Sequence, residues 1–180
     1  MAATSGKRLN LSEVQIRPFS SEASYNSFSC GKTPIDRFLK NKAKKTVSRH
    51  EQRVFCAHVG DTRPVIGYYA LSLGSDTVSD FIKQRDDYTK NRVAFPAVHM
   101  SFIGVHEDHQ RQGLGSHLLM DVFEKVAKIA QCAGLYALTL QSLDRESTAF
   151  YESLGFAKYS DDEQPKMLYP VADILALMER

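Results

Sequence analysis

The feature that most constrains the fold is a glycine-containing loop, residues 110–116, which lies between a strand-like run and the longest helical pattern of the chain. The strand-like run covers residues 93–105, and Gly104 within it indicates a bulge or a close backbone approach. Residues 114–133 carry one wide apolar stripe at helical spacing, and Gly134 follows as a stop signal. A strand joined to a long amphipathic helix predicts helices packed on a β-sheet.

Patterns elsewhere in the chain predict the remaining elements of an α/β (α+β) fold with a mixed sheet. Thr33 is the expected N-cap of a helix with Pro34 at its first position, and apolar residues recur every four positions as far as Val47. Two extended runs, residues 53–59 and 65–73, predict a hairpin. Further strands are expected at residues 14–18, 135–140 and 166–169, and a short helix at residues 144–154 that Gly155 closes.

The composition of the 180-residue chain is that of an ordinary globular protein, with 43% apolar and 24% charged residues. Cys30, Cys56 and Cys132 are odd in number and lack paired short spacing, which argues against a disulfide framework and a CxxC metal site. The chain shows no signal peptide and no apolar run of membrane-spanning length, so we expect a cytoplasmic protein without metal or membrane contact. Residues 1–12 are expected to form a flexible lead to a single domain over residues 13–180.

The composition of the 110–116 loop suits a diphosphate group. Glycines let successive backbone amides point into one concavity, the first amides of a helix carry partial positive charge, and Arg111 adds a full charge. The loop is not a Walker A motif, because the Lys-Ser/Thr ending is missing, and it lacks the third glycine of the dinucleotide fingerprint. The alternative is a helix N-terminus whose glycines serve only tight packing.

Two groups of residues resemble the signatures of the GCN5-related N-acetyltransferases (GNAT). The first group lies in the loop and comprises Gln110, Gly113 and Gly115. The second group comprises Asp144, Ser147, Phe150, Tyr151, Gly155 and Phe156. The resemblance implies a single GNAT domain with a mixed, mostly antiparallel central sheet flanked by helices, and acetyl-CoA as the cosubstrate.

The same resemblance assigns roles to residues. It implies that the backbone of residues 103–105 aligns the pantetheine arm of acetyl-CoA like an added strand. Tyr151 is the expected general acid for the departing CoA thiolate, because a tyrosine titrates near ~10 and is protonated at neutral pH. We expect Tyr151 to face the cleft while Phe150 fills the core. The expected contacts of acetyl-CoA are Ile103, Gly104, Val105, Gln110, Arg111, Gln112, Gly113, Leu114, Gly115, Ser116, Asp144 and Phe150.

The N-terminal half resembles a narrower group, the TacT-type toxin acetyltransferases. The matching residues are 28–31 (Phe-Ser-Cys-Gly), Ile35, Asp36, Phe38, Leu39, Phe55 and 65–71. Members of this group acetylate the α-amine of aminoacyl-tRNA, stop translation and pair with ribbon-helix-helix antitoxins, and the resemblance also implies a homodimer. The chain departs from the group at residues 140–142 (Leu-Gln-Ser), where Val-His-Ala is common, and at Ser147, where alanine is usual. These departures leave the acceptor amino acid open.

A dense run of basic residues, interrupted by the single acid Glu51, lies in the same half. The run comprises Lys40, Lys42, Lys44, Lys45, Arg49 and Arg53. We expect it to contact the phosphates of tRNA. Further basic residues expected to help are Lys83, Arg85, Lys90 and Arg92. The alternative for the run is a solvated helix face.

A strong general base is not required for an aminoacyl acceptor. Its esterified α-amine titrates below the ordinary α-amino value of about 7.7–8.0, whereas a lysine titrates near ~10.4. The candidates, if a base acts, are His99, His106, Glu107 and His109, and His117 is expected to be structural. Two alternative functions stay open: acetylation of a small amine or protein N-terminus, and a non-catalytic acyl-CoA-binding regulatory module whose basic helix contacts DNA or a protein.

Overall fold

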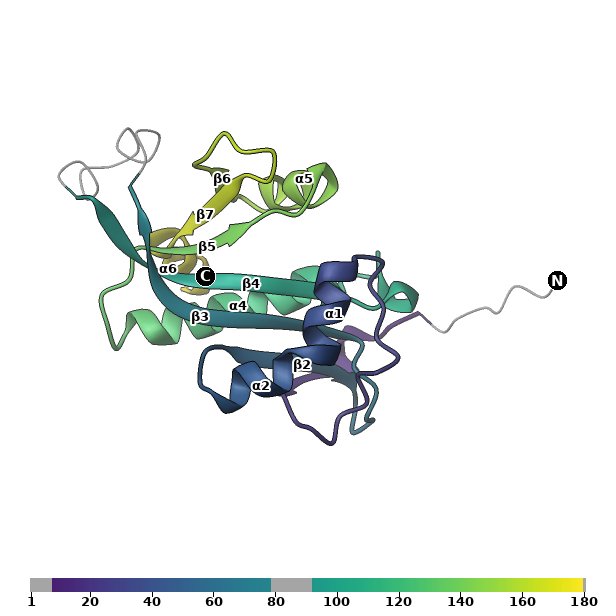
Figure 1. Ribbon diagram of the computed structural model, residues 1–180. Coiled ribbons are helices and arrows are strands. Elements are labelled where there is room, and N and C mark those ends of the chain that lie inside the picture. Colours follow the sequence, from purple (N-terminus) through teal and green to yellow (C-terminus); the bar gives the residue numbers. More distant parts are fainter. Residues whose placement is uncertain (1–7, 79–91, 180) are drawn as a thin grey trace. The chain divides into compact units, whose positions relative to one another are not determined.

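The computed structural model describes residues 8–78 and 92–179. Its strands form one sheet in the order β1-β2-β3-β4-β5-β7-β6 (Figure 1). The strands are β1 (Val14–Pro18), β2 (Arg53–Val59), β3 (Gly67–Thr77), β4 (Ala94–Val105), β5 (Ala137–Gln141), β6 (Ala157–Lys158) and β7 (Lys166–Pro170). The helices are α1 (Thr33–Asn41), α2 (Ala43–Ser48), α4 (Leu114–Ala130), α5 (Arg145–Ser153) and α6 (Val171–Met178), with 3-10 turns η1 (Leu11–Glu13) and η2 (Glu107–His109). A mixed, mostly antiparallel sheet flanked by helices confirms the predicted fold class.

The chain divides into two compact units. Unit 1 comprises Met1–Ala70 and Phe102–Asp121, and unit 2 comprises Leu71–Ser101 and Val122–Arg180. The boundary falls inside β3, β4 and α4, so each unit takes one part of these three elements. The single domain expected over residues 13–180 therefore stays a prediction.

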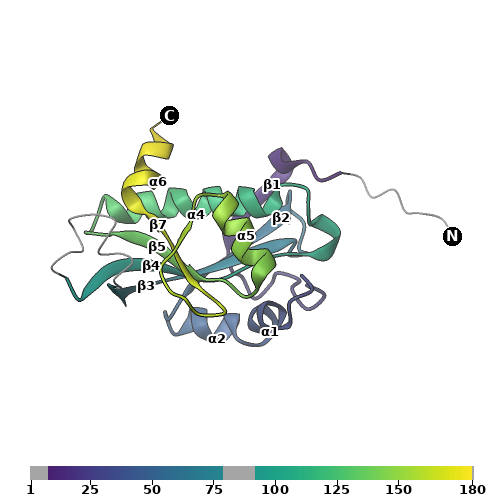
Figure 2. The ribbon, with the colours of Figure 1, turned by 90° about the horizontal axis from the view of Figure 1, so that it is seen from above.

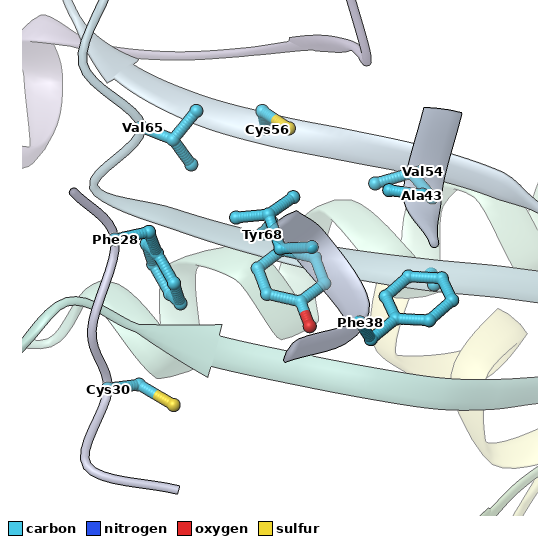
Figure 3. Packing of buried hydrophobic residues seen from close by; sticks show 10 residues of the cluster. Phe28, Cys30, Phe38, Ala43, Val54, Cys56, Val65 and Tyr68 are labelled. Atoms are coloured by element: carbon cyan, nitrogen blue, oxygen red, sulfur yellow. The ribbon is translucent and has the colours of Figure 1, made fainter. Parts of the chain in front are cut away.

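In unit 1, β1 and β2 pair antiparallel, with Val14 opposite Val59. Helices α1 and α2 cover one face of β2 and β3, and the start of α4 lies on the other face (Figure 2). Beneath the two short helices lies a buried cluster that includes the rings of Phe28, Tyr68 and Phe38, which lie side by side (Figure 3). Burial of these large apolar side chains anchors α1 and α2, with the basic residues they carry, to the sheet.

The helix predicted to follow Thr33 as far as Val47 is two helices. Thr33 is the first residue of α1 rather than its N-cap, because Lys32 takes the extended conformation that precedes the first turn. Lys42, with φ −119° and ψ −31°, ends α1, and the chain restarts as α2 at Ala43. Ala43 is fully buried in the cluster beneath the helices. The interruption thus lets the smallest residue of the stripe face the sheet.

In unit 2, β4 and β5 pair in parallel, with His99 opposite Thr139. Strands β5 and β7 pair antiparallel, with Thr139 opposite Leu168, and β6 pairs antiparallel with β7. A buried cluster that includes Phe95 and Tyr159 covers this part of the sheet. The parallel pair among antiparallel neighbours is the mixed sheet that the β-α-β alternation predicted.

Several bounds differ from the prediction. Strand β3 continues to Thr77, whereas the prediction ended it at residue 73. The prediction stopped there because residues 74–77 are small or polar and lack the strand pattern, although the structure shows them extended. Helix α4 ends at Ala130 rather than residue 133. Strand β6 and helix α6 were not predicted. The first has only 2 residues, and the second is a short apolar run directly after a strand, which periodicity does not separate from that strand.

The described part of the N-terminal lead contacts the 110–116 loop. The Leu9 amide donates to Gln112 Oε1 at 2.7 Å. The side chain of Leu11 lies 3.3 Å from the position that a Cβ at Gly113 would take. Residues 1–7 of the expected flexible lead lie outside the described residues. Within the rest of the lead, residues 8–12, Leu9 and Leu11 make these contacts.

Candidate functional site

The 110–116 loop turns the chain from η2 into α4 within unit 1. Arg111 and Gly113 have positive φ angles of 56° and 86°, so the backbone bends sharply before the helix. The His117 amide donates to the Gly113 carbonyl at 3.0 Å, and the helical amides before it have no acceptor within the helix. These amides and the helix dipole form a positive end that suits a diphosphate.

The two glutamines of the loop use their side chains within the protein. Gln110 Nε2 donates to the carbonyl of Cys30 at 2.9 Å and to that of Val105 at 3.0 Å. Gln112 Nε2 donates to the carbonyl of Asp108 at 2.9 Å. Both side chains therefore hold the loop in place, and the backbone is what these two residues offer to a ligand. Sequence reasoning singled out both glutamines but missed this scaffolding role.

The segment around Cys30 braces the end of β4. The Cys30 amide donates to Asp36 Oδ1 at 2.8 Å. Burial, and secondarily the hydrogen bond with Asp36, raises the pKa of the Cys30 thiol to about 12, so this thiol is not a nucleophile at neutral pH. Gly104 is buried beside this segment, and a Cβ there would lie 2.7 Å from Ile35 Cγ2. The close approach predicted at Gly104 is confirmed, and it shapes the backbone of residues 103–105.

The second signature forms a helix cap in unit 2. Asp144 is the N-cap of α5, and its Oδ1 accepts the Ser147 amide at 2.9 Å. Ser147 Oγ accepts the Asp144 amide at 3.0 Å, which completes a capping box. The Ser147 side chain therefore closes the cap. Gly155, with φ +96°, follows the other end of the helix.

Tyr151 is buried and Phe150 is exposed, whereas Phe150 was expected to fill the core. Phe150 is 38% exposed and Tyr151 only 7%, because helical spacing puts Tyr151 on the inward face of α5 with Thr148. The Tyr151 ring packs against Phe156, with centroids 5.5 Å apart. No hydrogen bond reaches its hydroxyl from the residues that the structure describes. Burial, and then the charge of Asp144, raises the pKa of the Tyr151 phenol, so it stays protonated as a proton donor must.

Three of the candidate bases lie on or beside η2 in unit 1. His106 Nδ1 accepts the Asp108 amide at 3.2 Å, and its ring packs edge-on against Phe28. Burial, and then the charge of His106, lowers the pKa of His109, whose ring centroid lies 6.1 Å from that of His106. Glu107 is exposed. These contacts are those of a turn and do not select one of the three as a base.

A polar network in unit 2 was missed by sequence reasoning. Asp76 accepts hydrogen bonds from the Tyr159 hydroxyl and from Lys166 Nζ, the latter at 3.1 Å. His99, the fourth candidate base, has its Nδ1 2.5 Å from Thr139 Oγ1. The residues come from β3, β4, β5, β7 and the position directly after β6, so no local pattern joins them. The only signal was an acid in a stretch that the sequence indicated to be polar loop.

The basic run extends from α1 through α2 to the start of β2, with Lys42 between the two helices and Arg49 directly after α2. Lys40 is half-buried, and the other members of the run are exposed. Arg49 forms an exposed ion pair with Glu51 at 3.7 Å. Lys83, Arg85 and Lys90 lie outside the described residues, whereas Arg92 is described and exposed.

Within residues 8–78 and 92–179, no group of three or more His, Cys, Asp or Glu side chains is arranged to hold a metal ion. In the same ranges no helix has both the length and the apolar character needed to cross a membrane. The cysteines are free thiols: Cys30 and Cys56 are buried and Cys132 is exposed.

The chain is similar to curated proteins along most of its length. "Probable toxin TacT" of Sinorhizobium fredii (strain NBRC 101917 / NGR234) is 30% identical over 159 residues, which are 84% of this chain and 87% of that protein. "tRNA-acetylating toxin" of Mycobacterium tuberculosis (strain ATCC 25618 / H37Rv) is 32% identical over 130 residues, 72% of this chain and 76% of that protein.

Solved structures share the fold. A mutant of the toxin AtaT, bound to the C-terminus of the antitoxin AtaR and acetyl-CoA, superposes with a TM-score of 0.80 at 20% identity and covers 93% of this chain and 99% of its own. The model of the acetyltransferase (GNAT) family matches residues 17–156, a range that holds both signatures. The chain therefore belongs to the acetyltransferase (GNAT) family.

Proposed function

We propose that this acetyltransferase moves the acetyl group of acetyl-CoA to the α-amine of the amino acid on an aminoacyl-tRNA, and that the resulting block of translation makes it a toxin. Both curated relatives are named as toxins, and one is named as tRNA-acetylating. The observation on this chain that carries the proposal is the basic run from α1 to the start of β2, which is exposed except for the half-buried Lys40. Such a run attracts the phosphate backbone of RNA, whereas a small amine gains nothing from it.

The main chain of unit 1 fits acetyl-CoA. The diphosphate would be held by the amides at the start of α4, with the exposed Arg111 beside them and Gly113 in a conformation that favours glycine. The backbone of residues 103–105 would align the pantetheine arm. When bound, acetyl-CoA supplies an acetyl group already activated as a thioester. Side chains of the loop contribute by keeping this backbone in place.

Tyr151 is the proposed general acid. Its hydroxyl is protonated and has no partner among the described residues, so it is available to donate to the sulfur as the C–S bond breaks. Burial also disfavours a thiolate, which raises the affinity of the departing sulfur for a proton. Burial thus raises the pKa of both the Tyr151 phenol and the CoA thiol, so proton transfer from the phenol to the departing sulfur stays feasible.

The proposal extends to partners and location. We propose a ribbon-helix-helix antitoxin as the neutralising partner, a homodimer as the oligomeric state and the cytoplasm as the compartment. A structural neighbour is a toxin bound to the C-terminus of its antitoxin, which supports a protein partner of this kind. Light scattering of the purified protein, alone and with the product of a neighbouring gene, tests the partner and the dimer.

The first experiment measures transfer of labelled acetyl groups from acetyl-CoA to a total aminoacyl-tRNA pool. Deacylated tRNA and the Tyr151→Phe variant serve as controls, with calorimetry confirming that the variant still binds CoA. We expect label on charged tRNA only, and a loss of about 10²-fold or more in the variant. CoA binding without label on charged tRNA would contradict the proposal and favour a small amine or a protein N-terminus as the acceptor.

The second experiment tests the basic run. The variant with Lys44, Lys45 and Arg49 changed to Glu should lose acetylation of charged tRNA while keeping its affinity for CoA. The control has the same change of net charge, with Arg63, Lys125 and Lys128 changed to Glu, and should stay active. Equal activity in the two variants would show that the run is only a solvated face.

A further inference from the structure

Gln112 lies at the most strained part of the 110–116 loop. Its two neighbours, Arg111 and Gly113, both have positive φ angles, of 56° and 86°. Glycine adopts this conformation readily, but arginine does so at a cost, because its Cβ crowds the backbone. Such a conformation persists only where surrounding contacts hold it. The side chain of Gln112, between the two residues, makes contacts of this kind.

The Gln112 side chain is held at both ends of its carboxamide. Its Nε2 donates to the Asp108 carbonyl at 2.9 Å, in the turn that precedes the loop. Its Oε1 accepts the Leu9 amide at 2.7 Å, from a residue 103 positions earlier in the sequence. A carboxamide that donates at one end and accepts at the other is fixed in orientation. The N-terminal segment therefore supplies one of the bonds that fix Gln112.

Leu11 makes a second contact between the N-terminal segment and the loop. Its Cδ1 lies 3.3 Å from the position that a Cβ at Gly113 would take, so the leucine covers that side of the glycine. Leu9 and Leu11 are both half-buried, whereas Arg8 before them is exposed. Burial of apolar surface favours this packing. The segment thus contacts the loop by a hydrogen bond and by an apolar side chain.

The same segment is anchored to the sheet. Asn10 caps η1, because its Oδ1 accepts the Ser12 amide at 3.2 Å and its Nδ2 donates to Glu13 Oε1 at 2.9 Å. The Glu13 carbonyl accepts the Gly60 amide at 2.8 Å, and β1, paired with β2, follows directly. Residues 9–13 therefore form an N-terminal arm that runs from the sheet to the loop, all within unit 1.

The N-terminal arm lies outside residues 17–156, the range that the family model matches. Its contacts are therefore not implied by membership of the family. We propose that the arm is a positioning element of the acetyl-CoA site, in which Leu9 and Leu11 hold the loop in the form that binds the diphosphate. The inference rests on the proposed role of the loop in binding acetyl-CoA and is independent of the acceptor. A loop already held in its binding form loses less conformational freedom on binding, so the arm raises affinity.

Coupling between the arm and the ligand must act in both directions. If the docked arm favours binding of acetyl-CoA, acetyl-CoA favours the docked arm by the same factor. Hydrogen–deuterium exchange of the wild-type protein measures this without any acceptor. Acetyl-CoA should slow exchange of the Leu9 amide by about 2- to 10-fold and leave the exposed residues 131–134 unchanged. Unchanged exchange at Leu9 would overturn the inference, and so would faster exchange, which would show that the ligand displaces the arm.

Calorimetry of variants tests the hydrogen bond from Leu9. Leu9→Pro removes the donor, because proline has no N–H, whereas Leu9→Ala keeps it. Leu9→Pro should bind acetyl-CoA about 2- to 10-fold more weakly than Leu9→Ala. With Gln112→Leu added to both, the acceptor is gone and the two affinities should be equal. Equal affinities of Leu9→Pro and Leu9→Ala in the presence of Gln112 would overturn the inference.

Kinetics with two acetyl donors test the apolar contact of Leu11. Leu11→Ala should raise KM for acetyl-CoA and leave kcat unchanged, because the diphosphate is remote from the acetyl group. Leu73→Ala, at a leucine that is 70% exposed, is the control. S-acetylpantetheine has the thioester but lacks the diphosphate, so with this donor kcat/KM of Leu11→Ala should equal that of the control.

Two results would contradict this prediction for Leu11. An equal loss with both donors would assign the effect to general damage, and no loss with either donor would show that the contact is not used. Each of them would overturn the inference. A wild-type protein that fails to bind acetyl-CoA in the calorimeter would overturn the proposed function as well, so the two failures are distinguishable.

Discussion

Gly104 shows how a single residue shapes the backbone that the proposal assigns to the pantetheine arm. A Cβ at this position would lie 2.7 Å from Ile35 Cγ2, and Phe28 and Cys30 leave no room for it to shift. We expect Gly104→Ala to lower the free energy of unfolding by about 1–3 kcal/mol through overpacking. Urea denaturation measures the effect, with Gly134→Ala as the control. A Gly104→Ala protein as stable as the control would mean that α1 moves away from the added methyl group without loss of stability.

Gln110 provides a second prediction at the residue scale. Gln110→Glu keeps the shape of the side chain but removes the donors to the carbonyls of Cys30 and Val105 and sets a charge against them. The loss should be about 1–3 kcal/mol of stability, with weaker binding of acetyl-CoA because the loop loosens. Denaturation and calorimetry measure both, and Gln131→Glu, at an exposed residue, is the control. Wild-type affinity in Gln110→Glu would argue against the scaffolding role.

At the scale of the element, the cap of α5 controls where Tyr151 lies. Asp144→Ala removes the acceptor for the Ser147 amide and should cost about 1 kcal/mol of stability. Asp144→Asn keeps an acceptor oxygen and should restore most of this loss. The free energy of unfolding of the three proteins decides the matter, with Asp161→Ala in the exposed 161–164 loop as the control. Equal losses in the alanine and asparagine variants would assign the effect to charge instead of capping.

Elements with strong local signals were predictable from sequence. Helix α4 has a long stripe and α5 has a cap, a periodic face and a terminal glycine, so both were found with small errors at their ends. The break at Lys42 was not predictable, because the four-residue spacing continues across it and only burial of Ala43 requires the turn. The inward position of Tyr151 was also missed, since either neighbouring aromatic residue fits the core by composition.

At the scale of the whole molecule, features formed by residues close together in the sequence could be predicted. Contacts between residues far apart in the sequence could not. The loop with Gly113 and the signature with Tyr151 are local strings and could be found. The bond from Gln110 to Cys30 joins residues 80 positions apart, and that from Lys166 to Asp76 joins residues 90 positions apart. Contacts of this kind depend on how strands pair, which no local pattern encodes.

The pH dependence of stability is a property of the whole chain to which His58 contributes. His58 is 5% exposed, and its Nδ1 lies 3.0 Å from the Pro64 carbonyl, to which it donates as a neutral ring. Burial, and to a lesser degree the charge of Arg17, lowers the pKa of His58 in the folded protein. The unfolded chain, where a histidine titrates near ~6.5, therefore takes up the proton first. The stabilisation is complete above that pH and is lost as the pH falls toward the folded value.

We therefore expect the free energy of unfolding to fall between pH 7.5 and pH 5.5. His109, whose pKa burial also lowers, adds to the slope in the same direction. His58→Asn keeps an N–H donor near the Nδ1 position and removes the titration, so its stability should depend less on pH even where its absolute stability is lower. His50→Asn, at an exposed histidine, should keep the wild-type slope. Urea denaturation across this range measures the slopes, and a wild-type slope in His58→Asn would show that other groups carry the acid sensitivity.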